Sequence, residues 1–145
     1  MTKKSMQIRF KKLCPEAVTP KAATAGSAGF DLVATRRRWN RELEIWEYGT
    51  GIAVEIPPGY VGLVFPRSSI YKTGALLSNS VGVIDSDYRG EIGAKFWPMK
   101  FREKYEIGDR IAQLVIVPIP RVEWVESEEL TATERGAGGY GSTGR

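Results

Sequence analysis

A chain of 145 residues, 42% of them hydrophobic, is long enough to form one domain with a core, and no apolar run reaches the ~20 residues that cross a membrane. The sequence has no histidine, which excludes a Ser-His-Asp triad, a Cys-His pair and a His-ligated zinc, so proton transfer falls to Asp, Glu, Lys, Tyr or a bound water. Its one cysteine excludes an internal disulfide, and its net charge of +4 favours polyanionic partners, among them nucleic acid and nucleoside polyphosphates.

The first third of the chain predicts short strands separated by turns. Residues 6–13 alternate apolar and polar side chains, as half-buried strands do, and the N-terminus has no apolar stretch typical of a signal peptide. Residues 26–33 form a glycine-rich turn that enters a strand, where Asp31 either bonds to the preceding turn or acts near a cation. Residues 36–50 predict a two-stranded excursion rich in arginine and tryptophan, and residues 52–56 predict another strand.

The middle of the chain predicts an anion-binding segment. Residues 60–65 read as a buried strand, and residues 66–74, PRSSIYKTG, follow at once. Either Ser68 or Ser69 is suited to cap a helix of one to two turns. Its free backbone N–H groups, two hydroxyls and Arg67 favour phosphate binding, and a capped helix with a solvated arginine is the structural alternative.

Residues 82–92, GVIDSDYRGEI, hold the densest cluster of acid, aromatic and glycine residues. The carboxylates of Asp85 and Asp87 are one residue apart, Tyr88 follows, and a strand is predicted over 91–96. Loops held by a rigid sheet commonly carry chemistry, which makes this stretch a candidate catalytic site. A tight hairpin turn is the alternative, because Asp, Ser and Gly are turn formers.

Residues 110–119 predict the most hydrophobic strand, in which Gln113 is the one polar side chain. A buried glutamine needs hydrogen-bond partners, either in the core or at the site. Residues 121–125 predict a last strand.

The glycine-dense segment 135–144 is either a floppy terminus or a phosphate cradle. Glycines allow close backbone approach, and Arg135, Ser142 and Thr143 are phosphate ligands. Tyr140 stands among glycines with little core to join, so it is suited to stack on a nucleobase.

Short strands at regular spacing, without a long helix, predict an all-β fold with one short helix, either a β-barrel or a jelly roll. The composition divides the chain into a barrel domain, residues 1–134, and a flexible glycine-rich arm, residues 135–145.

Five segments, in chain order, resemble the five motifs of the trimeric deoxyuridine triphosphatases (dUTPases). They are AGFDL (28–32), PRSSI (66–70), GVIDSDYRGEI (82–92), GDRIAQLVI (108–116) and RGAGGYGSTG (135–144). The resemblance implies the jelly-roll dUTPase fold and a homotrimer whose subunits share each active site. It also implies hydrolysis of dUTP to dUMP and pyrophosphate with Mg²⁺ on the triphosphate, an activity that limits uracil in DNA and supplies dUMP for dTMP synthesis.

The resemblance implies roles for several residues of the third motif and for Asn79. Asp85 would activate the water that attacks the α-phosphorus in line. Tyr88 would lie against the deoxyribose and leave no room for a 2′-hydroxyl. The uracil edge would be bound by Asn79 and by backbone groups of Gly82, Val83 and Ile84.

The other motifs would hold the triphosphate. Gln113 would position the catalytic water or a phosphate, and Asp31 would act near Mg²⁺, through water. The phosphates would be bound by Arg67, Ser68 and Ser69.

The arm would close over the nucleotide. Tyr140 would stack on uracil, and Gly141 lies among the glycines that bring the backbone close. The γ-phosphate would be reached by Arg135, Ser142 and Thr143.

Two positions depart from the family pattern. Ser69 stands where many members have glycine, and Tyr140 stands where phenylalanine is commoner. Residues 36–50 are longer and more charged than a minimal hairpin, and are the place where a protein partner would bind.

Three other functions compete with hydrolysis: deamination of dCTP, a regulatory binding module, and nucleic-acid binding. The Asp-Ser-Asp-Tyr order and the full arm favour hydrolysis, and interspersed acidic and basic residues argue against direct nucleic-acid binding. No membrane association is expected, and the expected location is the cytoplasm, or the interior of a virus-infected host cell.

Overall fold

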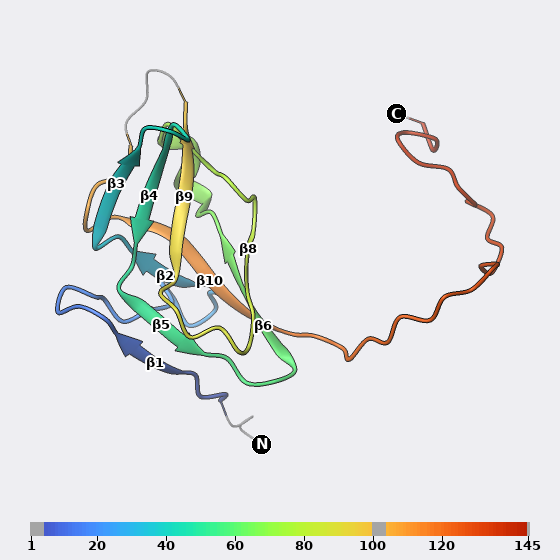
Figure 1. The fold of residues 1–145 in the computed structure, drawn as a ribbon, viewed down its shortest axis with the longest axis horizontal. Helices are drawn as coiled ribbons and strands as arrows, with labels where there is room; N and C mark the ends of the chain where they lie inside the picture. The colour runs from blue at the N-terminus through green and yellow to red at the C-terminus, as the bar shows by residue number, and fades with distance from the viewer. Residues whose placement is uncertain (1–4, 100–103, 145) are drawn as a thin grey trace.

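The computed structural model describes residues 5–99 and 104–144, and nearly all of its regular structure is β (Figure 1). Ten strands and one short helix follow in chain order: β1 (Arg9–Lys12), β2 (Phe30–Val33), β3 (Arg36–Asn40), β4 (Ile45–Gly49), β5 (Ile52–Glu55), β6 (Tyr60–Phe65), the 3₁₀ helix η1 (Ser68–Lys72), β7 (Ala75–Leu77), β8 (Gly82–Ile84), β9 (Gly93–Pro98) and β10 (Arg110–Pro118).

The strands form two four-stranded sheets and one two-stranded sheet. The first large sheet has the order β2-β10-β6-β8, the second has the order β3-β4-β9-β7, and β1 pairs with β5. All strand pairs are antiparallel. The predicted all-β, jelly-roll-like fold is confirmed, but within the described residues the sheets stay separate and do not close into a barrel.

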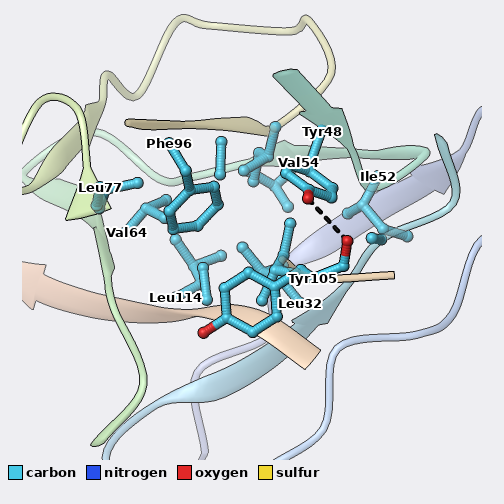
Figure 2. Packing of buried hydrophobic residues seen from close by; sticks show 14 of the residues in the cluster. Leu32, Tyr48, Ile52, Val54, Val64, Leu77, Phe96, Tyr105 and Leu114 are labelled. Carbon is cyan, nitrogen blue, oxygen red and sulfur yellow. Dashed lines mark hydrogen bonds between the residues drawn. The ribbon is translucent and has the colours of Figure 1, made fainter. Parts of the chain in front are cut away.

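The core lies between the large sheets (Figure 2). Leu32, Val64 and Leu114 contribute from the first sheet, and Leu77 and Phe96 from the second. Strand β9 shows why such side chains reach the core. Its first residues alternate between exposed and buried, which places Ala94 and Phe96 on the buried face. The expected face of residues 91–96 is thereby confirmed, although the strand begins two residues later.

Two buried tyrosines join this core. Tyr48 and Tyr105 pack edge to face, with ring centroids 6.3 Å apart, and the Tyr48 hydroxyl donates to the Tyr105 carbonyl at 2.8 Å. Burial raises the pKa of Tyr48 to about 12 and also raises the pKa of Tyr105. Both phenols therefore stay protonated at neutral pH and serve the core.

Two local predictions are wrong. Residues 121–125 form no strand, and Trp124 is 93% exposed. The predicted short helix exists as η1, but neither Ser68 nor Ser69 caps it, because Arg67 is the extended N-cap residue and makes no capping side-chain bond. The alternation of Val122, Trp124 and their polar neighbours predicts a strand only where another strand is available to pair.

The C-terminal segment leaves the sandwich after β10 (Figure 1). The last backbone bond to the body is donated by Ile119 to Gly59 at 2.9 Å, and the chain then runs outward as an extended coil. No helix among residues 5–99 and 104–144 is long and apolar enough to cross a membrane.

Candidate active site

Asp85 lies at the end of β8, on an exposed turn that other residues of the same motif hold in place. Its carbonyl accepts a hydrogen bond from the Tyr88 N–H at 3.1 Å. The Arg89 guanidinium donates to the carbonyls of Ser86, at 2.6 Å, and Tyr88, at 3.1 Å, and lies 3.7 Å from the Glu55 carboxylate. The turn leaves the Asp85 carboxylate facing solvent, and no ion pair to it occurs in the described structure.

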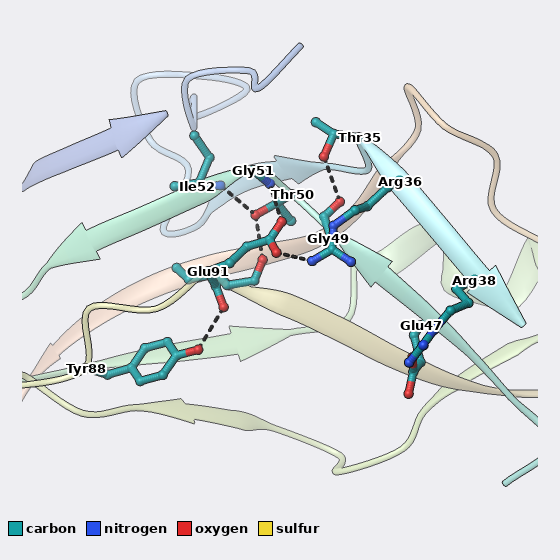
Figure 3. A network of polar contacts seen from close by, with 11 residues as sticks. Thr35, Arg36, Arg38, Glu47, Gly49, Thr50, Gly51, Ile52, Tyr88 and Glu91 are labelled. Atoms are coloured by element: carbon teal, nitrogen blue, oxygen red, sulfur yellow. Dashed lines mark hydrogen bonds and ion pairs between the residues drawn. The ribbon is translucent and has the colours of Figure 1, made fainter. Parts of the chain in front are cut away.

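Tyr88 lies three residues after Asp85, on the same turn. Its hydroxyl donates to the Glu91 carbonyl at 3.0 Å (Figure 3). A Cβ added at Gly90 would collide with the phenol, so glycine is required for the ring to lie against the backbone. The ring is 44% exposed and offers an apolar surface to a ligand.

Strand β8 supplies backbone groups for recognition. It is the edge strand of its sheet and pairs on one side with β6. Its other edge leaves N–H and C=O groups without a ladder partner, and the Val83 side chain is 62% exposed. Asn79 lies close by, because a Cβ at Gly82 would be 3.5 Å from its Nδ2. The predicted base-binding residues of this motif are thus brought together along one strand edge.

The second cluster lies at the other end of β6 and is organised by Asp31. One Asp31 carboxylate oxygen accepts from Arg67 Nε at 2.8 Å, and the other accepts from Arg110 Nη1 at 3.3 Å. Arg67 Nη1 also donates to Ser69 Oγ at 3.2 Å. Gln113 joins the cluster through Nε2, which donates to the Pro66 carbonyl at 3.0 Å.

These contacts add partners to Asp31 and Gln113 that the sequence analysis does not name. Asp31 bonds to arginines from the second and fourth motifs, which the sequence did not predict. Arg110 was missed entirely, although its charge opposite to that of Asp31 was visible in the sequence. Only the register of β2 against β10, with Asp31 opposite Gln113, brings the two charges together. Gln113 makes the hydrogen bond expected of a buried glutamine, and its partner belongs to the anion-binding segment.

The donor set decides how a divalent cation would be held. The described residues contain no group of three or more His, Cys, Asp or Glu side chains placed to ligate one. Mg²⁺ is commonly held by one or two carboxylates together with substrate phosphates. Within the described residues, this donor set suits a cation brought by a polyphosphate better than a cage made by the protein alone.

The two clusters lie apart in one chain. Ile84 pairs with Gly62, so Asp85 lies next to Val61 of β6. Arg67 comes six residues after Val61, beyond the end of β6. At ~3.3 Å per residue the separation is about 20 Å. The arm, residues 135–144, lies away from the sheets, on the segment that leaves the body after β10 (Figure 1).

The arginines of the β3–β4 hairpin form ion pairs with glutamates of the same chain. Arg36 pairs with Glu91, Arg37 with Glu106, and Arg38 with Glu47. The Arg37 guanidinium also lies 5.5 Å from the centre of the Trp46 ring. Three of the arginines that suggested a binding surface therefore have internal partners.

Comparisons with known proteins agree with this architecture. A family model described as dUTPase matches residues 15–144. The deoxyuridine 5′-triphosphate nucleotidohydrolase of Hydrogenobaculum sp. (strain Y04AAS1) is 44% identical over 96% of this chain and 99% of its own. The enzyme of the same name from Nautilia profundicola is 45% identical over 97% of this chain and 100% of its own.

Solved structures show the same fold. A dUTPase of Staphylococcus bacteriophage 80alpha, in a variant with dUpNHpp, is 28% identical, with a TM-score of 0.77 over 97% of this chain and 100% of its own. A variant dUTPase from phage phi11 of S. aureus is 26% identical, with a TM-score of 0.71 over 86% of this chain and 98% of its own. With a family model that covers residues 15–144 and relatives that match along nearly their whole length, this chain belongs to the dUTPase family.

Proposed function

We propose that this protein hydrolyses dUTP to dUMP and pyrophosphate. The observation that carries the proposal is the third motif, in which an exposed carboxylate, an exposed tyrosine and an open strand edge adjoin one another. The relatives named deoxyuridine 5′-triphosphate nucleotidohydrolase support the substrate and the bond that is cleaved.

Asp85 is the catalytic carboxylate in this proposal. Its solvent-facing position lets it accept a proton from a water that attacks the α-phosphorus in line, with pyrophosphate as the leaving group. Phosphoryl transfer depends mainly on positioning and on charge stabilisation. The absence of histidine from the sequence is compatible with this chemistry.

Base and sugar selection come from the same motif. Unpaired backbone groups of Gly82, Val83 and Ile84 bind the uracil edge, together with the Asn79 amide. The Tyr88 ring lies against the deoxyribose and excludes a 2′-hydroxyl. The ring thereby selects deoxyribose over ribose by steric exclusion of one extra oxygen.

The second cluster binds the triphosphate. Arg67 keeps donors beyond those used for Asp31 and Ser69, and the hydroxyls of Ser68 and Ser69 lie beside it. Gln113 positions the water or a phosphate. When Mg²⁺ is bound with the triphosphate it neutralises phosphate charge, and Asp31 would hold it through water. A phage dUTPase described as coordinating a structural Mg(II) ion gives this proposal a parallel in the family.

The site is shared between subunits of a homotrimer. About 20 Å separates Asp85 from Arg67 in one chain, and one triphosphate cannot be hydrolysed across that gap. A second copy that presents its Arg67 cluster to this Asp85 completes the site. The arm of a third copy closes over it, with Tyr140 on the base and Arg135, Gly141, Ser142 and Thr143 at the phosphates.

This activity would limit uracil in DNA and supply dUMP for dTMP synthesis, in the cytoplasm or inside an infected host cell. The test is pyrophosphate release from dUTP, UTP and the four standard dNTPs, each with and without Mg²⁺. We expect release from dUTP alone, and only with Mg²⁺. Release from several nucleotides would contradict the base and sugar assignments, and ammonia released from dCTP would identify a deaminase instead.

A further inference from the structure

The Tyr88 ring depends on contacts behind it for its orientation. Its hydroxyl donates to the Glu91 carbonyl, the ring lies against the Gly90 backbone, and 44% of the residue is exposed (Figure 3). A ring that is bonded at its tip to Glu91 and lies along Gly90 takes its position from the backbone of these two residues. The position of the Glu91 backbone therefore sets where the tyrosine ring lies.

The Glu91 backbone is held in turn by the bonds that the Glu91 side chain makes. One carboxylate oxygen accepts from the Gly51 N–H at 2.8 Å, and the other forms an ion pair with Arg36. The Glu91 side chain is only 21% exposed, so its charge needs these partners. Arg36 is 65% exposed and reaches Glu91 from β3, 55 residues away in the sequence.

The β4–β5 turn is shaped to receive this carboxylate. A Cβ at Gly49 would be 2.6 Å from a Glu91 carboxylate oxygen, so a side chain there would displace the ion pair. The buried Thr50 hydroxyl donates to the Ile92 carbonyl at 2.6 Å, and the Ile92 N–H donates to the Ile52 carbonyl at 2.8 Å. Residues 50–52 thus form three hydrogen bonds to Glu91 and its neighbour Ile92.

We propose that Arg36 and Glu91 are positioning residues that fix the Tyr88 ring and so set the choice between deoxyribose and ribose. In this proposal both residues act through the Glu91 carbonyl. The effect on sugar choice rests on the proposed dUTPase function. The effect on the position of the ring rests on the contacts drawn in Figure 3. One arginine of the 36–50 excursion thereby gains a role.

The kinetic test compares pyrophosphate release from dUTP and UTP by the full-length protein. Arg36→Met and Glu91→Gln are expected to lower the ratio of kcat/KM for dUTP to that for UTP by at least about fivefold, because a loosened ring excludes the 2′-hydroxyl less strictly. Arg36→Lys, which keeps the charge, is expected to restore most of the ratio. Arg38→Met is the matched control, because Arg38 lies on the same strand and face but pairs with Glu47. An unchanged ratio in both test variants, or an equal loss in the control, overturns the proposal.

A spectroscopic test separates this proposal from the catalytic one. With 3-fluorotyrosine in place of Tyr88, ¹⁹F NMR without nucleotide is expected to show a shifted or broadened resonance in Arg36→Met and an unchanged one in Arg38→Met. Equal spectra in all three proteins overturn the proposal, even for a variant with no measurable turnover. If the wild type releases no pyrophosphate from dUTP, the proposed function fails, and the NMR result alone decides whether the ion pair orients the ring.

Discussion

The two aspartates of the site differ in their surroundings, and this difference separates their roles. Asp85 is exposed on a turn and faces solvent, whereas Asp31 is partly buried between Arg67 and Arg110. A carboxylate that is bonded to two guanidiniums orients them, and a carboxylate open to water can take its proton. The role of each aspartate therefore depends on the side chains that the fold places next to its carboxylate.

Asp85→Asn is expected to lower kcat for dUTP by about 10²–10⁴-fold, the usual contribution of a general base. Binding of dUTP should remain measurable by calorimetry, because the amide keeps the shape of the carboxylate and the phosphate-binding residues are intact. Substantial remaining turnover would mean that another group orients the water.

Asp31→Asn distinguishes an organising carboxylate from a contact to metal-bound water. Loss of its charge leaves the partly buried Arg67 without its ion-pair partner, so we expect the free energy of unfolding to fall by about 1–2 kcal/mol, measured without Mg²⁺ by denaturant titration. Ser68→Ala serves as a control, since Ser68 is exposed and forms no ion pair. Equal stability of wild type and Asp31→Asn in the absence of metal would leave Asp31 with a role toward the cation only.

The β3–β4 hairpin depends on Glu47 at the scale of the element. Hydrogen bonds from Arg38 and Asn40, and then from Lys95, hold the pKa of Glu47 down, at about 2 against an ordinary value of 4.5. A carboxyl with a lowered folded-state pKa contributes stability that is complete above about pH 4.5 and is lost as the pH falls toward 2.

Thermal unfolding between pH 5 and pH 2 measures this contribution. The wild type should lose stability through that window, and Glu47→Gln should lose less, because it has no carboxyl to protonate at this position. Parallel curves for the two proteins would show that the Arg38–Glu47 pair does not support the hairpin.

Elements were easier to predict than their ends and partners. Alternation predicted β5, and continuous apolar runs predicted β6 and β10, because each strand packs on a core made within the chain. The same alternation was wrong for 121–125, where the structure offers no pairing strand. The contacts between residues far apart in the sequence were the least predictable feature. Asp31 contacts Arg110 only because of the β2–β10 register, and Arg36 contacts Glu91, which is 55 residues away in the sequence. The motif residues themselves were visible in the sequence, but their division into two separate clusters was not.

The extended arm belongs to the scale of the whole molecule. Tyr140 is fully exposed, and residues 120–144 continue away from the sandwich (Figure 1). An arm with so few contacts to its own body contributes little to that body's stability.

Deletion of residues 135–145 should therefore leave the unfolding temperature and the oligomeric state unchanged, while kcat/KM for dUTP falls by about 100-fold through loss of the closing segment. Light scattering, thermal unfolding and pyrophosphate release measure the three quantities. Full activity in the shortened protein would show that the arm does not close over the nucleotide.

In the proposed trimer, one subunit supplies Asp85 and another supplies Arg67 to the same site. Complementation between Asp85→Asn and Arg67→Ala chains, co-expressed and purified together, tests it most directly. In a random mixture of trimers about one quarter of the sites combine an intact Asp85 with an intact Arg67 from different chains, so the account predicts about a quarter of wild-type pyrophosphate release. If the mixed protein is no more active than the separate variants, the two clusters serve one site within a single chain and the account is wrong.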